Sequence, residues 1–140
     1  MSEPSLPAIL ADFAPEQAAL LPILHEVQAA FGCVDAEAEA AIAAYLNLSR
    51  AEVHGVVSFY HDFTAEFDPR PCVELCGAEA CQARGVEALV ASAQAAAGNR
   101  VRVKTVYCLG LCSSGPAARV GDTLLARLDE VKLTALVKSL

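Results

Sequence analysis

Cys76-Gly-Ala-Glu-Ala-Cys81 and Cys108-Leu-Gly-Leu-Cys112 are two short cysteine pairs separated by 26 residues. This separation is about the length of one supersecondary unit, so the chain can bring the four thiols to one place. Thiolates are soft ligands that select zinc, copper or iron–sulfur clusters. The two pairs therefore predict a metal centre held by Cys76, Cys81, Cys108 and Cys112.

The gaps of four and three residues within the pairs narrow the choice of metal. Zinc sites most often use Cys-x2-Cys, whereas a four-residue gap also occurs in plant-type iron–sulfur proteins. Gly77 and Gly110 fit loops that wrap a cluster, since no Cβ separates their backbone N–H groups from sulfur. An iron–sulfur cluster is favoured, and a zinc-stabilised interaction module is the alternative. Alternatively, the four cysteines could be small buried hydrophobic residues without a ligand role. Cysteines scattered through a core would not be expected to form two short-gap pairs, which argues against this alternative.

The residues around the cysteines resemble one known family. The resemblance is carried by Arg84-Gly85, Pro116, Leu24-His25-Glu26-Val27-Gln28, Phe31-Gly32 and Glu52-Val53-His54-Gly55-Val56-Val57-Ser58-Phe59-Tyr60, together with the cysteine pairs. The chain resembles the thioredoxin-like ferredoxins, which include the small subunit of the NADH-oxidising module of respiratory complex I. They also include the gamma subunits of soluble NAD-dependent formate dehydrogenases and hydrogenases. Residues 78–82 and 47–54 most resemble the formate dehydrogenase subunits.

The resemblance implies a fold, a cofactor and a partner. The expected fold is of the α+β or α/β class, with an N-terminal helical subdomain followed by a thioredoxin-like 2Fe-2S domain. One 2Fe-2S cluster would be bound by Cys76, Cys81, Cys108 and Cys112. The chain, non-catalytic alone, would exchange single electrons with the flavin of an NADH-binding partner subunit in a larger complex. An NAD-dependent formate dehydrogenase is favoured over complex I or a hydrogenase, and a mobile carrier without a permanent partner is a further alternative.

Two cysteines are left out of the predicted ligand set. Cys72 is separated from Cys76 by the same gap as Cys108 from Cys112. If residues 72–76 are extended, however, Cys72 lies roughly 13 Å from Cys76, too far to share one compact cluster. We therefore expect Cys72 to be a buried strand residue and Cys33 to be structural.

Composition excludes several other functions. The net charge of −7, without a basic patch, argues against nucleic-acid binding. The longest uncharged run, 14 residues from Thr105 to Ala118, contains Cys, Gly, Ser and Pro, so we expect no direct membrane insertion. No signal-peptide pattern is present, which favours the cytoplasm, where thiols stay reduced. No phosphate loop, dinucleotide fingerprint or nucleophile constellation occurs, so no catalytic residue is assigned.

The chain pattern predicts two domains, residues 1–69 and 70–140, joined at Asp68-Pro69-Arg70-Pro71. The first domain should start with a loosely held arm and contain three helices, the third opened by a capping box from Ser49 to Glu52. Its four aromatic residues should lie in a core: Phe59, Tyr60, Phe63 and Phe67. The second domain should follow the order β-α-β-β-β-α, with one long helix over residues 80–97 and a hairpin turn at Gly121-Asp122. His25, His54 and His61 have no companion ligands at metal spacing and are expected to be surface or hydrogen-bonded residues.

Overall fold

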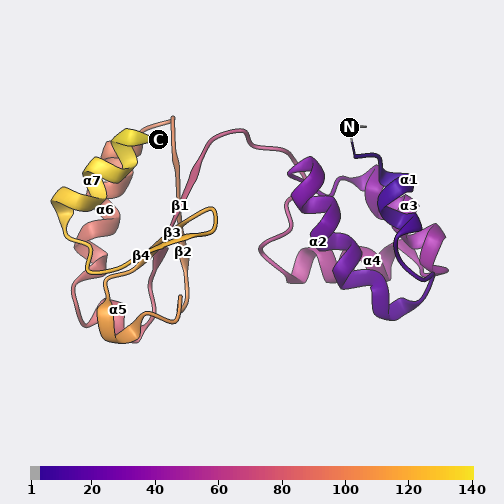
Figure 1. Ribbon diagram of the computed structural model, residues 1–140, viewed down its shortest axis with the longest axis horizontal. Coiled ribbons are helices and arrows are strands. Elements are labelled where there is room, and N and C mark those ends of the chain that lie inside the picture. The colour runs from indigo at the N-terminus through magenta and orange to yellow at the C-terminus, as the bar shows by residue number, and fades with distance from the viewer. Residues whose placement is uncertain (1–3) are drawn as a thin grey trace. The chain divides into compact units, whose positions relative to one another are not determined.

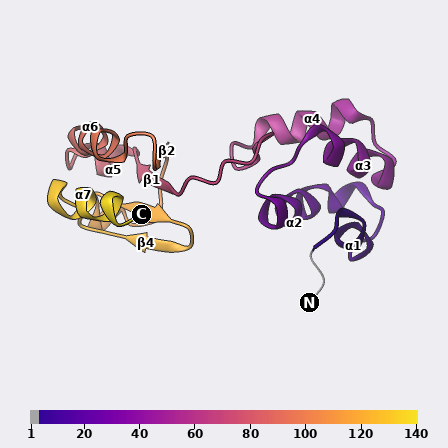
Figure 2. The same ribbon diagram turned by 90° about the horizontal axis from the view of Figure 1, so that it is seen from above.

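Two units, Met1–Asp68 and Pro69–Leu140, make up the computed structural model, which describes residues 4–140 (Figure 1). The first unit is helical, and the second contains a four-stranded sheet with helices (Figures 1 and 2). Each unit has its own apolar core. No helix in the described part of the chain is both long and apolar enough to cross a membrane.

The described residues of the first unit form four α-helices and one 3-10 helix. They are α1 (Leu6–Ala11), η1 (Gln17–Ala19), α2 (Leu20–Phe31), α3 (Ala36–Leu46) and α4 (Arg50–Phe59). The helix ends follow from local chemistry. Gly32 ends α2 with a left-handed φ of 73°, and the Asp35 carboxylate caps α3 by accepting from the Ala38 N–H at 2.8 Å. Ser49 and Glu52 form the expected capping box at the start of α4.

The core of this unit corrects two expectations. The N-terminal arm contains α1, which is held because Leu10 is buried in the helical core. Of the four aromatic residues expected inside, only Phe63 is buried, at 7% exposure. Phe59 and Phe67 are 73% and 63% exposed, and Tyr60 is 40% exposed. Apolar composition alone could not separate core from surface here, because aliphatic residues on α2, α3 and α4 already fill the interior: Ile23, Leu24, Val27, Ile42 and Val53.

The second unit is built on the strand β1 (Cys72–Cys76). The other strands are β2 (Arg102–Val106), β3 (Ala118–Val120) and β4 (Thr123–Leu125), and the sheet order is β2-β1-β3-β4. β1 is parallel to β2 and antiparallel to β3, and β3 and β4 form a hairpin. The remaining elements are α5 (Glu79–Gln82), α6 (Val86–Ala97), the 3-10 turn η2 (Cys112–Ser114) and α7 (Glu130–Ser139).

Helices α6 and α7 pack side by side on one face of this sheet (Figure 1). Val73 and Leu75, two residues apart on β1, point into the core they share with Ala93, Leu133 and Val137. The mixed helix and sheet architecture confirms the predicted fold class. The long helix expected over residues 80–97 is wrong in one respect, because Gly85 at φ 81° divides it into α5 and α6. Cys81 consequently sits on a short helix of its own.

Candidate metal centre

The ends of two parallel strands place both cysteine pairs at one edge of the sheet. Cys76 is the last residue of β1 and is in register with Val106, the last residue of β2. The loop after β1 leads to Cys81, and the loop after β2 carries Cys108 and Cys112. Open α/β sheets build sites outside the carboxyl ends of their strands, because neighbouring parallel strands deliver their loops to the same place.

The first pair lies inside the protein. Cys76 and Cys81 are each 2% exposed, and they form a small apolar cluster with Val86 and Ala117. Side chains from both cysteine loops pack against this cluster: Ala78, Leu109 and Leu111. Backbone hydrogen bonds hold the position, since the N–H of Cys76 donates to the carbonyl of Ala117 at 2.9 Å. Residues of both cysteine loops thus surround the first pair.

The second pair is exposed to solvent. The Sγ atoms of Cys108 and Cys112 are 3.6 Å apart, well beyond a disulfide bond of about 2.05 Å, and both cysteines are free thiols. Cys108 has a φ of 70° and Gly110 a φ of 77°, so the loop turns back on itself through two left-handed residues. Such a conformation is uncommon for a residue with a side chain, and Cys108 adopts it at the point where the chain leaves β2.

The thiols of the two pairs influence one another. Burial opposes ionisation of the Cys76 thiol. Backbone hydrogen bonds at Ala78, Cys108 and Leu109, together with the Cys81 side chain, outweigh burial and lower the pKa of Cys76. Hydrogen bonds to this sulfur therefore come from both cysteine loops.

The neighbouring thiols are shifted in the opposite direction. Burial raises the pKa of Cys81, and the adjacent charges of Cys76 and Cys112 raise it further. The pKa of Cys112 is raised by the Cys108 side chain, and also by Cys76. Neighbouring ionised thiols oppose the ionisation of Cys81 and of Cys112, because like charges disfavour the charged form.

The four thiols lie in two pairs, one from each loop. In the hydrogen-bonding pattern, Cys76 pairs with Cys81 and Cys108 pairs with Cys112. Within residues 4–140, no group of three or more His, Cys, Asp or Glu is placed to hold one metal ion. A structural zinc ion takes four ligands at one point, whereas a 2Fe-2S cluster distributes four thiolates over two irons. Four thiols in two pairs suit the second arrangement.

Gly77 permits close packing at this edge and Gly110 permits a left-handed turn, whereas both were expected to expose their N–H groups to sulfur. A Cβ on Gly77 would lie 2.6 Å from Cγ2 of Thr105, and the Gly77 N–H donates to the carbonyl of Val106 at 2.7 Å. Gly77 thus lets the first loop lie directly against β2. Around Gly110 nothing lies within 4 Å of an added Cβ, so the requirement there is the left-handed φ.

Sequence reasoning missed the parts played by Arg84 and Gly115. The Arg84 guanidinium donates through Nη1 to the carbonyl of Cys112 and through Nη2 to the carbonyl of Ser113, the latter at 3.3 Å. A Cβ on Gly115 would lie 2.9 Å from the Cys81 Sγ. The one signal in the sequence was the Arg84-Gly85 dipeptide after Cys81, which carries part of the family resemblance but does not indicate what the arginine contacts.

The other two cysteines are separate from this arrangement. Cys72 lies at the opposite end of β1 from Cys76 and is partly exposed, so the expectation that it is buried is wrong. The side chains beside it include charged groups of the sheet surface, Glu74 and Arg119, whose Oε2 and Nε atoms are 2.6 Å apart.

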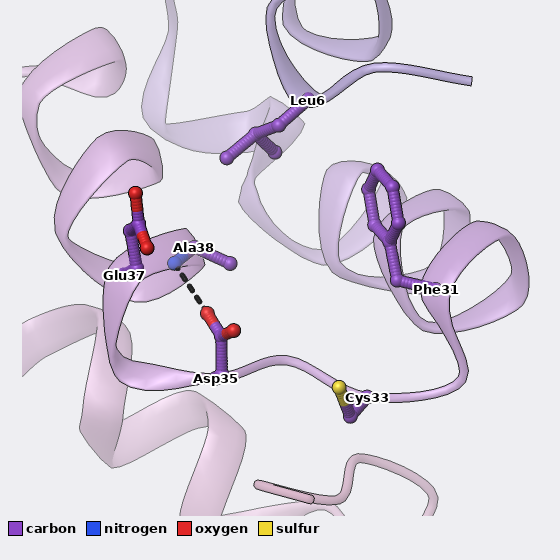
Figure 3. A pocket seen from close by; sticks show the side chains of 6 residues that line it. All are labelled: Leu6, Phe31, Cys33, Asp35, Glu37 and Ala38. Atoms are coloured by element: carbon purple, nitrogen blue, oxygen red, sulfur yellow. Dashed lines mark hydrogen bonds between the residues drawn. The ribbon is translucent and has the colours of Figure 1, made fainter. Parts of the chain in front are cut away.

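Cys33 belongs to the helical unit, where it borders a pocket of about 270 Å³ (Figure 3). Figure 3 shows the apolar side chains of Leu6 and Phe31 beside this pocket and the capping hydrogen bond between Asp35 and Ala38. No other cysteine lines the pocket among the residues that the structure describes.

His54 and His25 make contacts within the helical unit. Nδ1 of His54 lies 3.1 Å from both carboxylate oxygens of Glu39, which is only 7% exposed. His25 packs edge-on against Phe63, with ring centroids 5.0 Å apart. These contacts give both rings a structural role in the helical unit.

Comparison with known proteins shows the family of this chain. A family model described as "Thioredoxin-like [2Fe-2S] ferredoxin" matches residues 6–140. The chain is 29% identical to one of the NADH-quinone oxidoreductase subunits of Rhizobium meliloti (strain 1021), over 94% of this chain and 84% of that protein. It is 28% identical to the HndA subunit of the NADP-reducing hydrogenase of Solidesulfovibrio fructosivorans, over 74% of this chain and 66% of that protein.

A solved structure is similar as well. In the crystal structure of an NAD+-reducing [NiFe]-hydrogenase in the H2-reduced state, one chain matches with a TM-score of 0.73 and 26% identity. The match covers 90% of this chain but only 22% of the hydrogenase chain. This chain therefore corresponds to about a fifth of that longer polypeptide.

Proposed function

The chain belongs to the thioredoxin-like [2Fe-2S] ferredoxin family, and we propose that Cys76, Cys81, Cys108 and Cys112 are the ligands of its single 2Fe-2S cluster. The observation that carries this proposal is the convergence of the two pairs at the carboxyl ends of β1 and β2. When bound, the cluster supplies a one-electron carrier whose potential depends on charge, hydrogen bonds to sulfur and exposure.

The protein is an electron-transfer subunit of the kind found in NADH-oxidising complexes. Its own residues bind the cluster and leave one side of it accessible, because Cys108 and Cys112 are exposed whereas Cys76 and Cys81 are buried. The exposed pair defines the side from which an electron partner approaches. No catalytic residue is assigned to this chain.

The proposed partner is a flavin-containing, NADH-binding subunit of a larger complex. Relatives of the chain are subunits of an NADH-quinone oxidoreductase and an NADP-reducing hydrogenase, which supports a partner complex of this type. We propose an NAD-dependent formate dehydrogenase as the complex, on the local resemblance of residues 47–54 and 78–82, with complex I and a hydrogenase as the alternatives. The proposed compartment is the cytoplasm, where reduced thiols remain available for iron.

Spectroscopy of the purified protein distinguishes a 2Fe-2S cluster from the zinc alternative. We expect a brown protein with two irons and two sulfides per chain, whose visible absorption is bleached by dithionite and whose reduced state gives an EPR signal. A colourless protein that retains stoichiometric zinc and does not respond to dithionite would contradict the proposal. Identifying the proteins that co-purify from the native host would then distinguish the three complexes.

A further inference from the structure

Arg84 connects the two cysteine loops. Its backbone N–H donates to the carbonyl of Cys81 at 3.1 Å, which fixes its main chain at the end of the helix that carries the first pair. Its guanidinium donates to the carbonyls of Cys112 and Ser113, at the start of η2. One residue is therefore anchored by its backbone to the first pair and by its side chain to the second.

The approach of the second loop to Arg84 is close. A Cβ on Gly115 would lie 2.9 Å from the Cys81 Sγ and 3.7 Å from Nη1 of Arg84, so the chain leaving η2 passes against both groups. Helix α5 also packs against η2. The planar, two-pronged guanidinium suits this position because it donates to two successive carbonyls in a fixed geometry, which an ammonium group cannot reproduce.

Arg84 also brings a positive charge to the site. The run from Thr105 to Ala118, which includes Cys108 and Cys112, contains no charged side chain of its own. The guanidinium group of arginine is a cation in proteins. A fixed cation beside the ligands favours the reduced state of a cluster, because reduction adds one negative charge.

We infer that Arg84 is a positioning residue of the cluster site: it clamps the Cys112 loop onto the Cys81 loop and raises the reduction potential of the cluster. This inference rests on the proposed ligand set. Arg84 has two proposed effects. Holding the loops together requires both guanidinium N–H donors, whereas raising the reduction potential requires only the positive charge.

Two substitutions separate these effects. Arg84→Gln removes the positive charge and one of the two hydrogen-bond donors. Arg84→Lys keeps the charge but loses the bidentate geometry. Arg100→Gln, at an exposed arginine beyond the end of α6, is the matched control for the loss of one positive charge from this unit. The measurements on each full-length holoprotein are the rate of cluster bleaching by an iron chelator and the midpoint potential from an EPR-monitored redox titration.

We expect Arg84→Gln to lose its cluster about ten-fold faster than the wild type, as the loss of a charge-assisted hydrogen bond implies, and to have a lower potential. Arg84→Lys should also bleach faster but keep the wild-type potential, and Arg100→Gln should match the wild type in both measurements. An Arg84→Gln potential equal to that of the wild type would overturn the inference, because a purely structural contact also explains faster bleaching. Equal bleaching rates in all four proteins would overturn it too. A wild-type protein that binds no iron would instead refute the proposed function.

Discussion

Gly115 shows how little room the cysteine loops leave for a side chain. Its φ of −68° is available to any residue, so the backbone does not require glycine there. The requirement is space, because an added Cβ would lie 2.9 Å from the Cys81 Sγ. That sulfur is buried and belongs to the proposed ligand set. A shift of the sulfur would move it away from its position as a cluster ligand.

Gly115→Ala is expected to lower the free energy of unfolding by about 1–3 kcal/mol and to weaken retention of the cluster, since overpacking forces neighbouring groups to shift. Gly55→Ala is the control: it lies inside α4, nothing lies within 4 Å of its added Cβ, and alanine should stabilise the helix by about 0.5–1 kcal/mol. Calorimetry and iron analysis measure both effects. A Gly115→Ala protein as stable and as rich in iron as the wild type would contradict the predicted close contact.

Alanine substitution of each cysteine tests the ligand set. Replacing any one of Cys76, Cys81, Cys108 and Cys112 should abolish or destabilise the cluster, because one iron loses a thiolate. Cys33→Ala and Cys72→Ala should leave iron content and the EPR signal of the reduced protein unchanged. Loss of iron from Cys72→Ala would show that the assignment is wrong.

The helices α4 and α7 each begin with a side-chain cap. Hydrogen bonds from the side chain and backbone of Ser49 lower the pKa of Glu52 below its ordinary value of 4.5. A hydrogen bond from the Lys132 backbone N–H lowers the pKa of Asp129 below 3.8. Both carboxylates are therefore more easily ionised in the folded protein than in the unfolded chain.

A lowered folded-state pKa fixes the sign of the pH dependence. The caps stabilise the fold fully above pH 4.5 for Glu52 and above pH 3.8 for Asp129, and this stabilisation disappears as the pH falls through the lower folded-state values. Glu52→Ala and Asp129→Ala should each lower Tm at pH 7 and lose that deficit relative to the wild type in acid. Thermal melts of the iron-free proteins between pH 7 and pH 3 measure this, and a deficit that is independent of pH would contradict it.

Loss of the Ser49 hydroxyl should also destabilise α4. Ser49→Ala leaves an N–H group at the helix start without its side-chain acceptor and should cost about 1 kcal/mol. Ser139→Ala is a suitable control, since the Ser139 hydroxyl donates to the carbonyl of Leu136 at the other end of a helix and caps no N-terminus. Urea unfolding curves compare the two, and equal midpoints would argue against a stabilising cap at Ser49.

The whole chain contains two units with separate cores. The core residues of the helical unit all lie between Leu10 and Phe63, and those of the cluster unit lie between Val73 and Val137. The cluster unit contains all four proposed ligands. The helical unit contributes none of the proposed ligands. We propose that its residues 15–60 dock the protein onto its flavoprotein partner.

A fragment that starts at Pro69 tests this docking role. After reconstitution with iron and sulfide it should keep its cluster but lose affinity for the flavoprotein, because its own core and ligands are complete while the docking helices are missing. Undiminished affinity would refute the docking role. Loss of the cluster would also count against it, because the helices would then serve to complete the cluster domain.

The isolated protein should neither bind nor oxidise NADH, because its sequence contains no dinucleotide fingerprint. The measurement is anaerobic titration of the oxidised holoprotein with NADH, with and without the flavoprotein. Bleaching by NADH should require the flavoprotein. Stoichiometric bleaching without it would contradict the prediction.

The sequence by itself indicated the donor chemistry and the type of most of the main elements. Thiols at short gaps, the capping box at Ser49 and the alternation along residues 101–105 are local patterns, and their physical causes act within a few residues. The family also followed from the sequence, because its signature lies in the same motifs. The net charge of −7 likewise argues against nucleic-acid binding.

Only the tertiary structure decided which residues connect the two cysteine loops. Arg84 and Cys112 are 28 residues apart, and Gly115 meets Cys81 across 34 residues of chain. No local pattern encodes these contacts, because they arise when the parallel pairing of β1 with β2 brings two loops to one edge. The exposure of Phe59 and Phe67, which were predicted to lie in a core, is also a tertiary property. Burial depends on which surfaces the packed helices leave uncovered, and the hydrophobicity of a side chain alone does not determine it.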